Sequence, residues 1–223
     1  MTPLTPPRST SRGEGVELAF GDLRSPESVV ERLLQASGLC YTIGRADFFM
    51  DDWLALIGSS IPLRGAESHT LERPFWFSRF FMRVVGHLVE GRGIALVPGP
   101  GTTRHAFIAL EDVAEFMVRS LEAPAAEDAV WEVGGPEALS WDEAVAVFAR
   151  VVGRSIRAVH QPAGVFRAML TALSPLSPAA GNLMGLNYIA ATSDTTADAR
   201  ALARTLGLER TSLETFLRAR VQS

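Results

Sequence analysis

Short apolar runs alternate with helix-periodic segments along most of the chain, and this alternation limits the possible folds more than any other feature. Residues 16–20 and 39–43 have strand length, and each leads into a loop. Four further runs with strand character follow at residues 94–97, 106–109, 130–133 and 156–159. Strands that alternate with helices predict an α/β fold with a largely parallel sheet and helices on both faces.

Helix start and stop signals lie between these runs. Ser25 and Pro26 suit the start of a helix that Ser37-Gly38 would end. Residues 75–88 are predicted as a helix with Val84 and Leu88 facing inward, and residues 110–121 as an amphipathic helix. Ser140, followed three residues later by Glu143, predicts a capping box.

Composition excludes several classes of protein. A net charge of −4 argues against nucleic acid as the main partner. The single cysteine, Cys40, excludes an internal disulfide and fits a reducing cytoplasm. No apolar run reaches the roughly 20 residues that span a membrane, so no membrane partner is expected. Residues 1–14 are rich in Pro, Thr, Ser and Arg, and we expect a disordered lead-in without a signal peptide.

All 21 basic residues are arginines. The absence of lysine excludes a Schiff base, a phosphate-binding loop of the Gly-Lys-Ser/Thr type, and a Tyr-x-x-x-Lys pair. The histidines have no metal-ligand spacing, so no metal site is predicted.

Five motifs occur in a characteristic order: Gly21-Asp22-Leu23, residues 37–45, Phe107 to Ala114, Gly135 to Glu143, and Leu206 to Phe216. Together they resemble an atypical short-chain dehydrogenase/reductase of the NmrA-like or epimerase-like kind. The resemblance implies NADP or NAD as cofactor, with Asp22 at the adenine. It also implies that the strand ending at Arg45 emerges beside the nicotinamide and the substrate, although Ala46 replaces the proline of the family pattern.

The chain also departs from this pattern. It contains no Gly-x-Gly-x-x-Gly turn, whose backbone N–H groups would hold the pyrophosphate. Two strands and two helices are missing around Gln35-Ala36, and with them the catalytic Ser and Tyr-x-x-x-Lys. The fourth residue after Tyr41 is Arg45, and the fourth after Tyr188 is Thr192, so no catalytic residue is predicted. We expect a partial Rossmann-like NAD(P)-binding domain over residues 15–160 and a helical region over residues 161–223.

Seven residues are candidates for the site. The cofactor-binding candidates are Asp22, Leu23, Arg45 and Phe48, and the substrate-pocket candidates are Phe49, Trp53 and His105. Each has an alternative role. Asp22 suits a turn, Arg45 suits an ion pair with Asp47, Asp51 or Asp52, and the aromatic rings suit the core. His105 lies in a turn-rich stretch and is predicted to be the most exposed histidine, either a proton donor or an ordinary loop residue. Asp112 and Glu111 are predicted to stabilise a helix start.

Three functions remain open at this point. The first is an NAD(P)-binding protein of this family with a degenerate cofactor site, in which binding is weakened or lost. The second is an active NAD(P)-dependent oxidoreductase or isomerase acting on a small molecule. The third is a non-catalytic small-molecule-binding or interaction protein. Apolar faces left uncovered by the missing strands also predict a homodimer or an aggregation-prone monomer.

Overall fold

The computed structural model describes residues 29–61, 83–195 and 199–222, and the chain forms two compact units, Met1–Leu39 and Cys40–Ser223. The described part of the first unit is helix α1 (Val29–Ala36) and the turn that ends it. There, the Ser37 hydroxyl donates to the Leu34 carbonyl at 2.6 Å, and Gly38 has a φ of 72°. The predicted strand over residues 16–20, the Ser25 cap and the predicted lead-in over residues 1–14 lie outside the described residues.

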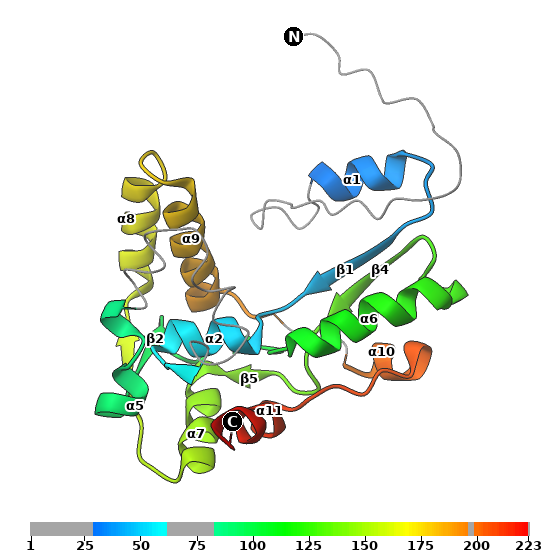
Figure 1. The fold of residues 1–223 in the computed structure, drawn as a ribbon. Helices are drawn as coiled ribbons and strands as arrows, with labels where there is room; N and C mark the ends of the chain where they lie inside the picture. The colour runs from blue at the N-terminus through cyan, green and yellow to red at the C-terminus, as the bar shows by residue number, and fades with distance from the viewer. Residues whose placement is uncertain (1–28, 62–82, 196–198, 223) are drawn as a thin grey trace. The chain divides into compact units, whose positions relative to one another are not determined.

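The second unit has the predicted α/β composition (Figure 1). Its strands are β1 (Thr42–Ala46), β2 (Ile94–Pro98), β3 (Arg104–His105), β4 (Ala129–Val133), β5 (Leu139–Ser140) and β6 (Arg157–Gln161). Its helices are α2 (Met50–Ile57), α5 (Leu88–Arg92), α6 (Leu110–Glu122), the 3-10 helix η2 (Pro124–Ala126), α7 (Trp141–Val152), α8 (Ala163–Leu173), α9 (Pro178–Thr192), α10 (Ala199–Leu206) and α11 (Leu213–Gln222).

The described strands pair two by two. β1 lies parallel to β4, with Thr42 opposite Ala129 and Ala46 opposite Val133. β2 lies parallel to β6, whereas the short β3 and β5 are antiparallel. The two longer pairs confirm the prediction of parallel pairing, which requires crossover connections that carry helices.

Two apolar clusters flank these strands. The larger one buries Trp53, Phe107, Trp141 and Phe148, each at most 2% exposed, between α2, β2, α7 and α11. The second cluster lies where α6 packs along β1 and β4, and it buries Phe116. Gly44 of β1 makes this packing close, because a Cβ at that position would lie 2.7 Å from the Phe116 ring. Helices α8 and α9 form an antiparallel hairpin with a third, smaller cluster of its own.

The predicted capping box of α7 is confirmed. The Ser140 hydroxyl accepts from the Glu143 backbone N–H at 3.1 Å, and the Glu143 carboxylate accepts from the Ser140 N–H at 2.8 Å. The helix predicted over residues 75–88 lies mostly outside the described residues. Leu88 begins α5, and Val84 is 60% exposed, so the predicted inward position of Val84 is wrong.

Candidate functional site

Asp47 directly follows β1 and joins three separate segments of the chain. Its backbone N–H donates to the Val133 carbonyl at 3.0 Å, which extends the β1–β4 pairing by one residue. Its carboxylate accepts hydrogen bonds from Phe48 N–H at 2.7 Å, from Ala106 N–H at 2.7 Å and from the Thr195 hydroxyl at 2.5 Å. The loop after β1, the segment after β3 and the segment after α9 therefore meet at this one side chain.

His105 is one of the groups held there, and the prediction that it is exposed is wrong. The side chain is 0% exposed. Its Nδ1 lies 2.7 Å from the Thr195 hydroxyl and its Nε2 lies 3.2 Å from the Ala190 carbonyl. Burial lowers the pKa of His105 below its ordinary value of 6.5, and the nearby Asp47 carboxylate opposes this effect. The turn-rich sequence before His105 does not show that β3 pairs with β5 and with Thr195.

The structure brings Phe48, Trp53 and His105 together in one aromatic group with Phe107 and Trp141. The Phe48 and His105 ring centroids are 4.9 Å apart, and the Trp53 and Phe107 centroids are 5.7 Å apart. Phe48 is 7% exposed and Trp53 is 0% exposed. These three residues lie in the larger core cluster or against it, beneath the carboxyl end of β1.

Phe49 lies on the other side of the same loop. Its extended backbone, with φ of −68° and ψ of 137°, directs its side chain away from that of Phe48. Phe49 packs against the cluster that contains Phe116, and it forms a bridge with Ile108. The structure thus separates Phe49 from Trp53 and His105, with which it was predicted to form a pocket.

Arg45 pairs across the strands with the residue opposite it. Its Nη1 lies 3.1 Å from Glu132 Oε1, and the two side chains are 35% and 54% exposed. The sequence indicated an ion pair with a nearby aspartate as the alternative to a ligand contact. It could not indicate Glu132, which lies on β4 and becomes a neighbour only through the parallel register.

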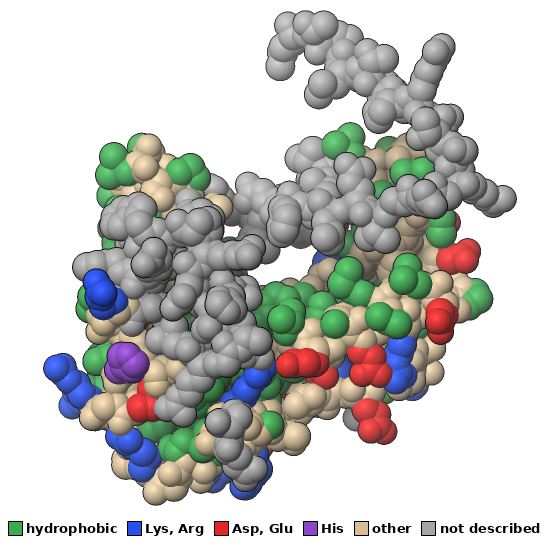
Figure 2. Space-filling view, in the orientation of Figure 1, with side chains coloured by type: hydrophobic (Ala, Val, Ile, Leu, Met, Phe, Trp, Pro, Cys, Tyr) green, Lys and Arg blue, Asp and Glu red, His purple; other side chains and the backbone are tan. Residues whose placement is uncertain are grey.

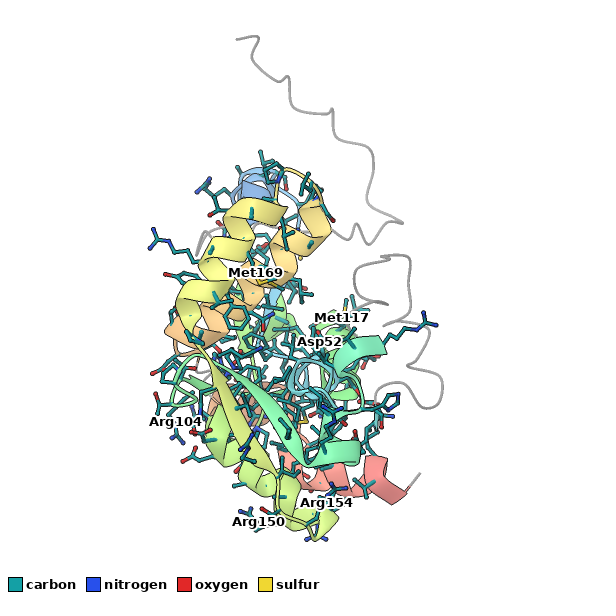
Figure 3. All side chains as sticks on the ribbon, turned by 90° about the vertical axis from the view of Figure 1, so that its left-hand side faces the viewer. Asp52, Arg104, Met117, Arg150, Arg154 and Met169 are labelled. Atoms are coloured by element: carbon teal, nitrogen blue, oxygen red, sulfur yellow. The ribbon has the colours of Figure 1, made fainter. Side chains whose placement is uncertain are left out.

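Two further acidic side chains have distinct surroundings. Asp52, labelled in Figure 3, lies in the first turn of α2, and burial raises its pKa above the ordinary value of 3.8. Asp112 is 5% exposed, and it accepts hydrogen bonds from Thr211 N–H at 2.7 Å and from the Thr211 hydroxyl at 3.0 Å. Asp112 therefore connects the start of α6 to the segment before α11.

Asp22 and Leu23 lie outside the described residues. Within residues 29–61, 83–195 and 199–222, no three His, Cys, Asp or Glu side chains are grouped as metal ligands would be. No helix in these ranges is long and apolar enough to cross a membrane.

Comparison with known proteins identifies the fold. No protein-family model matches the sequence, and no curated protein matches it at a significant level. Solved structures do match. An NADPH-dependent quinone oxidoreductase from Escherichia coli has a TM-score of 0.59 at 18% identity, over 86% of this chain and 59% of that protein. At this identity the similarity shows the fold, which is Rossmann-like α/β. The resemblance of the five motifs predicted this fold, and it is confirmed.

Other solved structures match a similar share of this chain. A nucleoside-diphosphate-sugar epimerase from Staphylococcus aureus has a TM-score of 0.55 at 15% identity, over 84% of this chain and 55% of that protein. An isoflavone reductase has a TM-score of 0.53 at 14% identity, over 85% of this chain and 55% of that protein. The chain thus spans a little over half the length of these solved proteins.

Proposed function

We propose that the chain is an NAD(P)-binding protein with a degenerate cofactor site, and that it transfers no hydride through a tyrosine–lysine pair. The observation that carries this proposal is the parallel pair β1–β4, whose first strand ends in a loop leading directly into α2. Ligands of open α/β sheets bind outside the carboxyl ends of the strands. A nicotinamide cofactor belongs at this edge if the chain uses its fold as NADPH-dependent proteins of the same fold do.

Arg45 is the described side chain best suited to contact the cofactor. It is the fourth residue of β1, and its guanidinium is one-third exposed. Guanidinium groups bind phosphate and carbonyl oxygens well. Glu132 competes for the same guanidinium and weakens any such contact. The family resemblance implies that Asp22 contacts the adenine, and Leu23 next to it is a further cofactor-binding candidate.

The aromatic candidates have a supporting role in this proposal. Phe48, Trp53 and His105 are buried, so they hold the loop after β1 in place from beneath. Phe49 is partly buried on the opposite side of the loop, where its ring is the candidate for contact with a nicotinamide or a small substrate.

The site is degenerate because its means of binding phosphate are weak. The sequence has no Gly-x-Gly-x-x-Gly turn and no lysine. The helix that begins at the carboxyl end of β1 carries Asp51 and Asp52 in its first turn. A helix N-terminus attracts phosphate, but carboxylates in the first turn weaken that attraction. Arg220 Nη2 lies 3.7 Å from Asp51 Oδ1 and offsets part of this charge. We therefore expect weak binding that is set mainly by Arg45.

Cofactor titration tests the proposal. NADPH and NADH are added to the protein, and energy transfer from its four tryptophans to the nicotinamide is recorded. We expect saturation near a Kd of about 1 mM, equivalent to about −4 kcal/mol. Saturation at about 1 μM would refute the degenerate site, and no saturation by about 10 mM would refute cofactor binding altogether.

Two matched substitutions test the location of the site. Arg45→Gln removes the cation and should raise the Kd several-fold. Glu132→Gln removes its competitor and should lower the Kd. The two variants alter the same ion pair, so damage to the strands would change the Kd in one direction only. Equal Kd values in both variants and the wild type would exclude Arg45 as a cofactor contact.

We also propose a homodimer in a reducing compartment such as the cytoplasm, where the exposed thiol of Cys40 would persist. An apolar stripe on α6 supports the dimer, because Leu110, Met117, Val118 and Leu121 are between 46% and 78% exposed (Figure 2). Exposed apolar stripes of this kind mark interaction surfaces. Light scattering should give twice the chain mass of 24.1 kDa. Leu121→Glu should give a monomer, whereas the control Val165→Glu, at an exposed position on α8, should remain a dimer. A wild-type mass of 24.1 kDa would refute the dimer.

A further inference from the structure

Three polar side chains form a buried chain of contacts that the proposed function does not use. Asp47 contacts Thr195, and Thr195 contacts His105. The His105 ring lies among Phe48, Phe107 and Trp141, whose centroids are 4.9 to 6.0 Å away. A polar network inside an apolar surrounding must satisfy each of its donors and acceptors, so its protons can be assigned one by one.

Asp47 determines the position of the first proton. Its carboxylate already accepts from two backbone N–H groups, those of Phe48 and Ala106. The Thr195 oxygen lies only 2.5 Å from it, so the single hydroxyl proton of Thr195 points toward Asp47. Thr195 can then only accept from His105, and the proton of the neutral His105 ring is therefore on Nδ1.

The other ring nitrogen faces an acceptor. His105 Nε2 lies 3.2 Å from the Ala190 carbonyl, and a carbonyl oxygen can only accept. With Nδ1 protonated, the neutral ring has no proton for this contact, which is the longest of the three. Ala190 is in the last turn of α9, where backbone carbonyls carry partial negative charge. A second proton on His105 would therefore lie on Nε2, where it could be donated to the Ala190 carbonyl.

Burial opposes that second proton. The charged and polar groups facing the ring are Asp47 beyond Thr195, Asp194 in the segment after α9, and the Ala190 carbonyl; α9 itself has no charged side chain. Arg104 next to His105 directs its guanidinium to Glu143, 3.0 Å away, and to the Ala138 carbonyl (Figure 3). The loss of water outweighs all the favourable groups, and the pKa of His105 falls below 6.5.

We infer that Asp47, Thr195 and His105 form a latch that holds the segment after α9 against β1 and β3, and that a second proton on His105 opens it. In the closed latch, Thr195 N–H donates to the Arg104 carbonyl at 2.8 Å, and the Thr195 carbonyl accepts from Ala106 N–H at 3.1 Å. Opening breaks these bonds and exposes the His105 ring to water. The open form binds a proton more tightly than the closed form, so acid favours opening.

The pH range follows from the same linkage. Above about pH 7.5, one unit above the ordinary histidine pKa, neither form carries the second proton to a large extent, and the opening equilibrium hardly depends on pH. Below that value the open form is protonated first, and opening increases until the pH reaches the lower pKa of the closed form. Between pH 7.5 and pH 5.0 the equilibrium constant for opening increases by at most about 30-fold, a limit set by the ordinary histidine pKa of the open form.

Hydrogen exchange at the Thr195 amide measures this opening. Its protection factor, corrected for the pH dependence of intrinsic exchange, should fall several-fold from pH 7.5 to pH 5.0. His105→Asn keeps a neutral donor near the position of Nδ1 and should remove the pH dependence. His87→Asn, at an exposed histidine, should preserve it. Equal wild-type protection at both pH values, or a pH dependence that persists in His105→Asn, would overturn the latch.

A second measurement needs no substitution at His105. The ¹⁵N chemical shifts of its ring report both the tautomer and the titration midpoint in the wild-type chain. We expect the Nδ1–H tautomer at neutral pH and a midpoint below 6.5. An Nε2–H tautomer, or a midpoint at or above 6.5, would contradict the inference even if His105→Asn fails to fold.

Discussion

Replacing Asp112 with alanine should destabilise the second unit more than any other single removal of a charge at the start of α6. The Asp112 side chain is 5% exposed and makes two hydrogen bonds to Thr211, one to the backbone N–H and one to the hydroxyl. It also lies in the first turn of α6, where negative charge interacts favourably with the helix dipole. Asp112→Ala removes all three interactions and leaves the Thr211 N–H without its acceptor.

The magnitude follows from these contacts. A hydrogen bond to a charged group contributes about 1.5–3 kcal/mol, and the dipole adds about 0.3–1 kcal/mol. Because the two bonds share one carboxylate and are not additive, we expect a loss of about 3–4 kcal/mol in the free energy of unfolding. That loss is a large share of a typical stability of about 5–15 kcal/mol.

Urea unfolding followed by tryptophan fluorescence provides the assay. Glu111→Ala is the matched control, because Glu111 lies in the same turn but is exposed. It forms a surface ion pair with Arg220 at 3.2 Å, so its loss should change stability by no more than about 1 kcal/mol. A double-mutant cycle with Thr211→Val isolates the pair and should give a coupling of about 1–3 kcal/mol. If Asp112→Ala costs no more than Glu111→Ala, or the coupling is near zero, the reasoning is refuted.

Three other perturbations have defined outcomes. Gly135→Ala places a Cβ 2.0 Å from the Phe107 carbonyl oxygen and should lower the free energy of unfolding by about 3 kcal/mol or more. Gly164→Ala on α8 places its Cβ with no atom within 4 Å and should be neutral or stabilising. The urea midpoints of the two variants measure the difference. Ser140→Ala breaks the capping box of α7 and should lower the free energy of unfolding by about 1 kcal/mol. Ser140→Asp, which keeps an oxygen acceptor at the N-cap, should retain most of the stability of the wild type. Because the folded pKa of His105 is lowered, its contribution to stability is present above pH 6.5 and lost as the pH falls, by at most about 1.4 kcal/mol per pH unit. Unfolding curves of the wild type and His105→Asn at pH 7.5 and 5.5 measure it, and parallel changes in both would exclude His105 as the cause.

The types of most elements follow from local sequence patterns. The capping box at Ser140 and the parallel pairing of β1 and β4 could be predicted from periodicity, turn residues and helix caps alone. Residues 106–109 depart from their local pattern. All four are buried, as an apolar run predicts, but the strand is Arg104–His105 instead. The hydrogen bonds of Ala106 and Ile108 go to Thr195 and Phe48, which lie far away in the sequence.

The candidate site was less predictable for the same reason. The sequence indicates Asp47, Asp51 or Asp52 as the ion-pair partner of Arg45, whereas the contact with Glu132 depends on the strand register. The sequence indicates Asp47 only as an ion-pair partner, and it contains no signal for the role of Thr195. An aspartate immediately after a strand is a weak signal for a carboxylate that binds backbone N–H groups. No local pattern around Asp47 predicts its contact with the Thr195 hydroxyl, because Thr195 follows α9, far away in the sequence.

The separation of these contacts along the chain also determines when they can form during synthesis. Arg45 and Glu132 are 87 residues apart, and Asp47 and Thr195 are 148 apart. At about 5–20 residues per second, β1 waits roughly 4–17 s for β4 and Asp47 waits roughly 7–30 s for Thr195. The newly made β1 therefore waits for β4 and waits longer still for Thr195, so the segment after α9 attaches after β1 and β4 can pair.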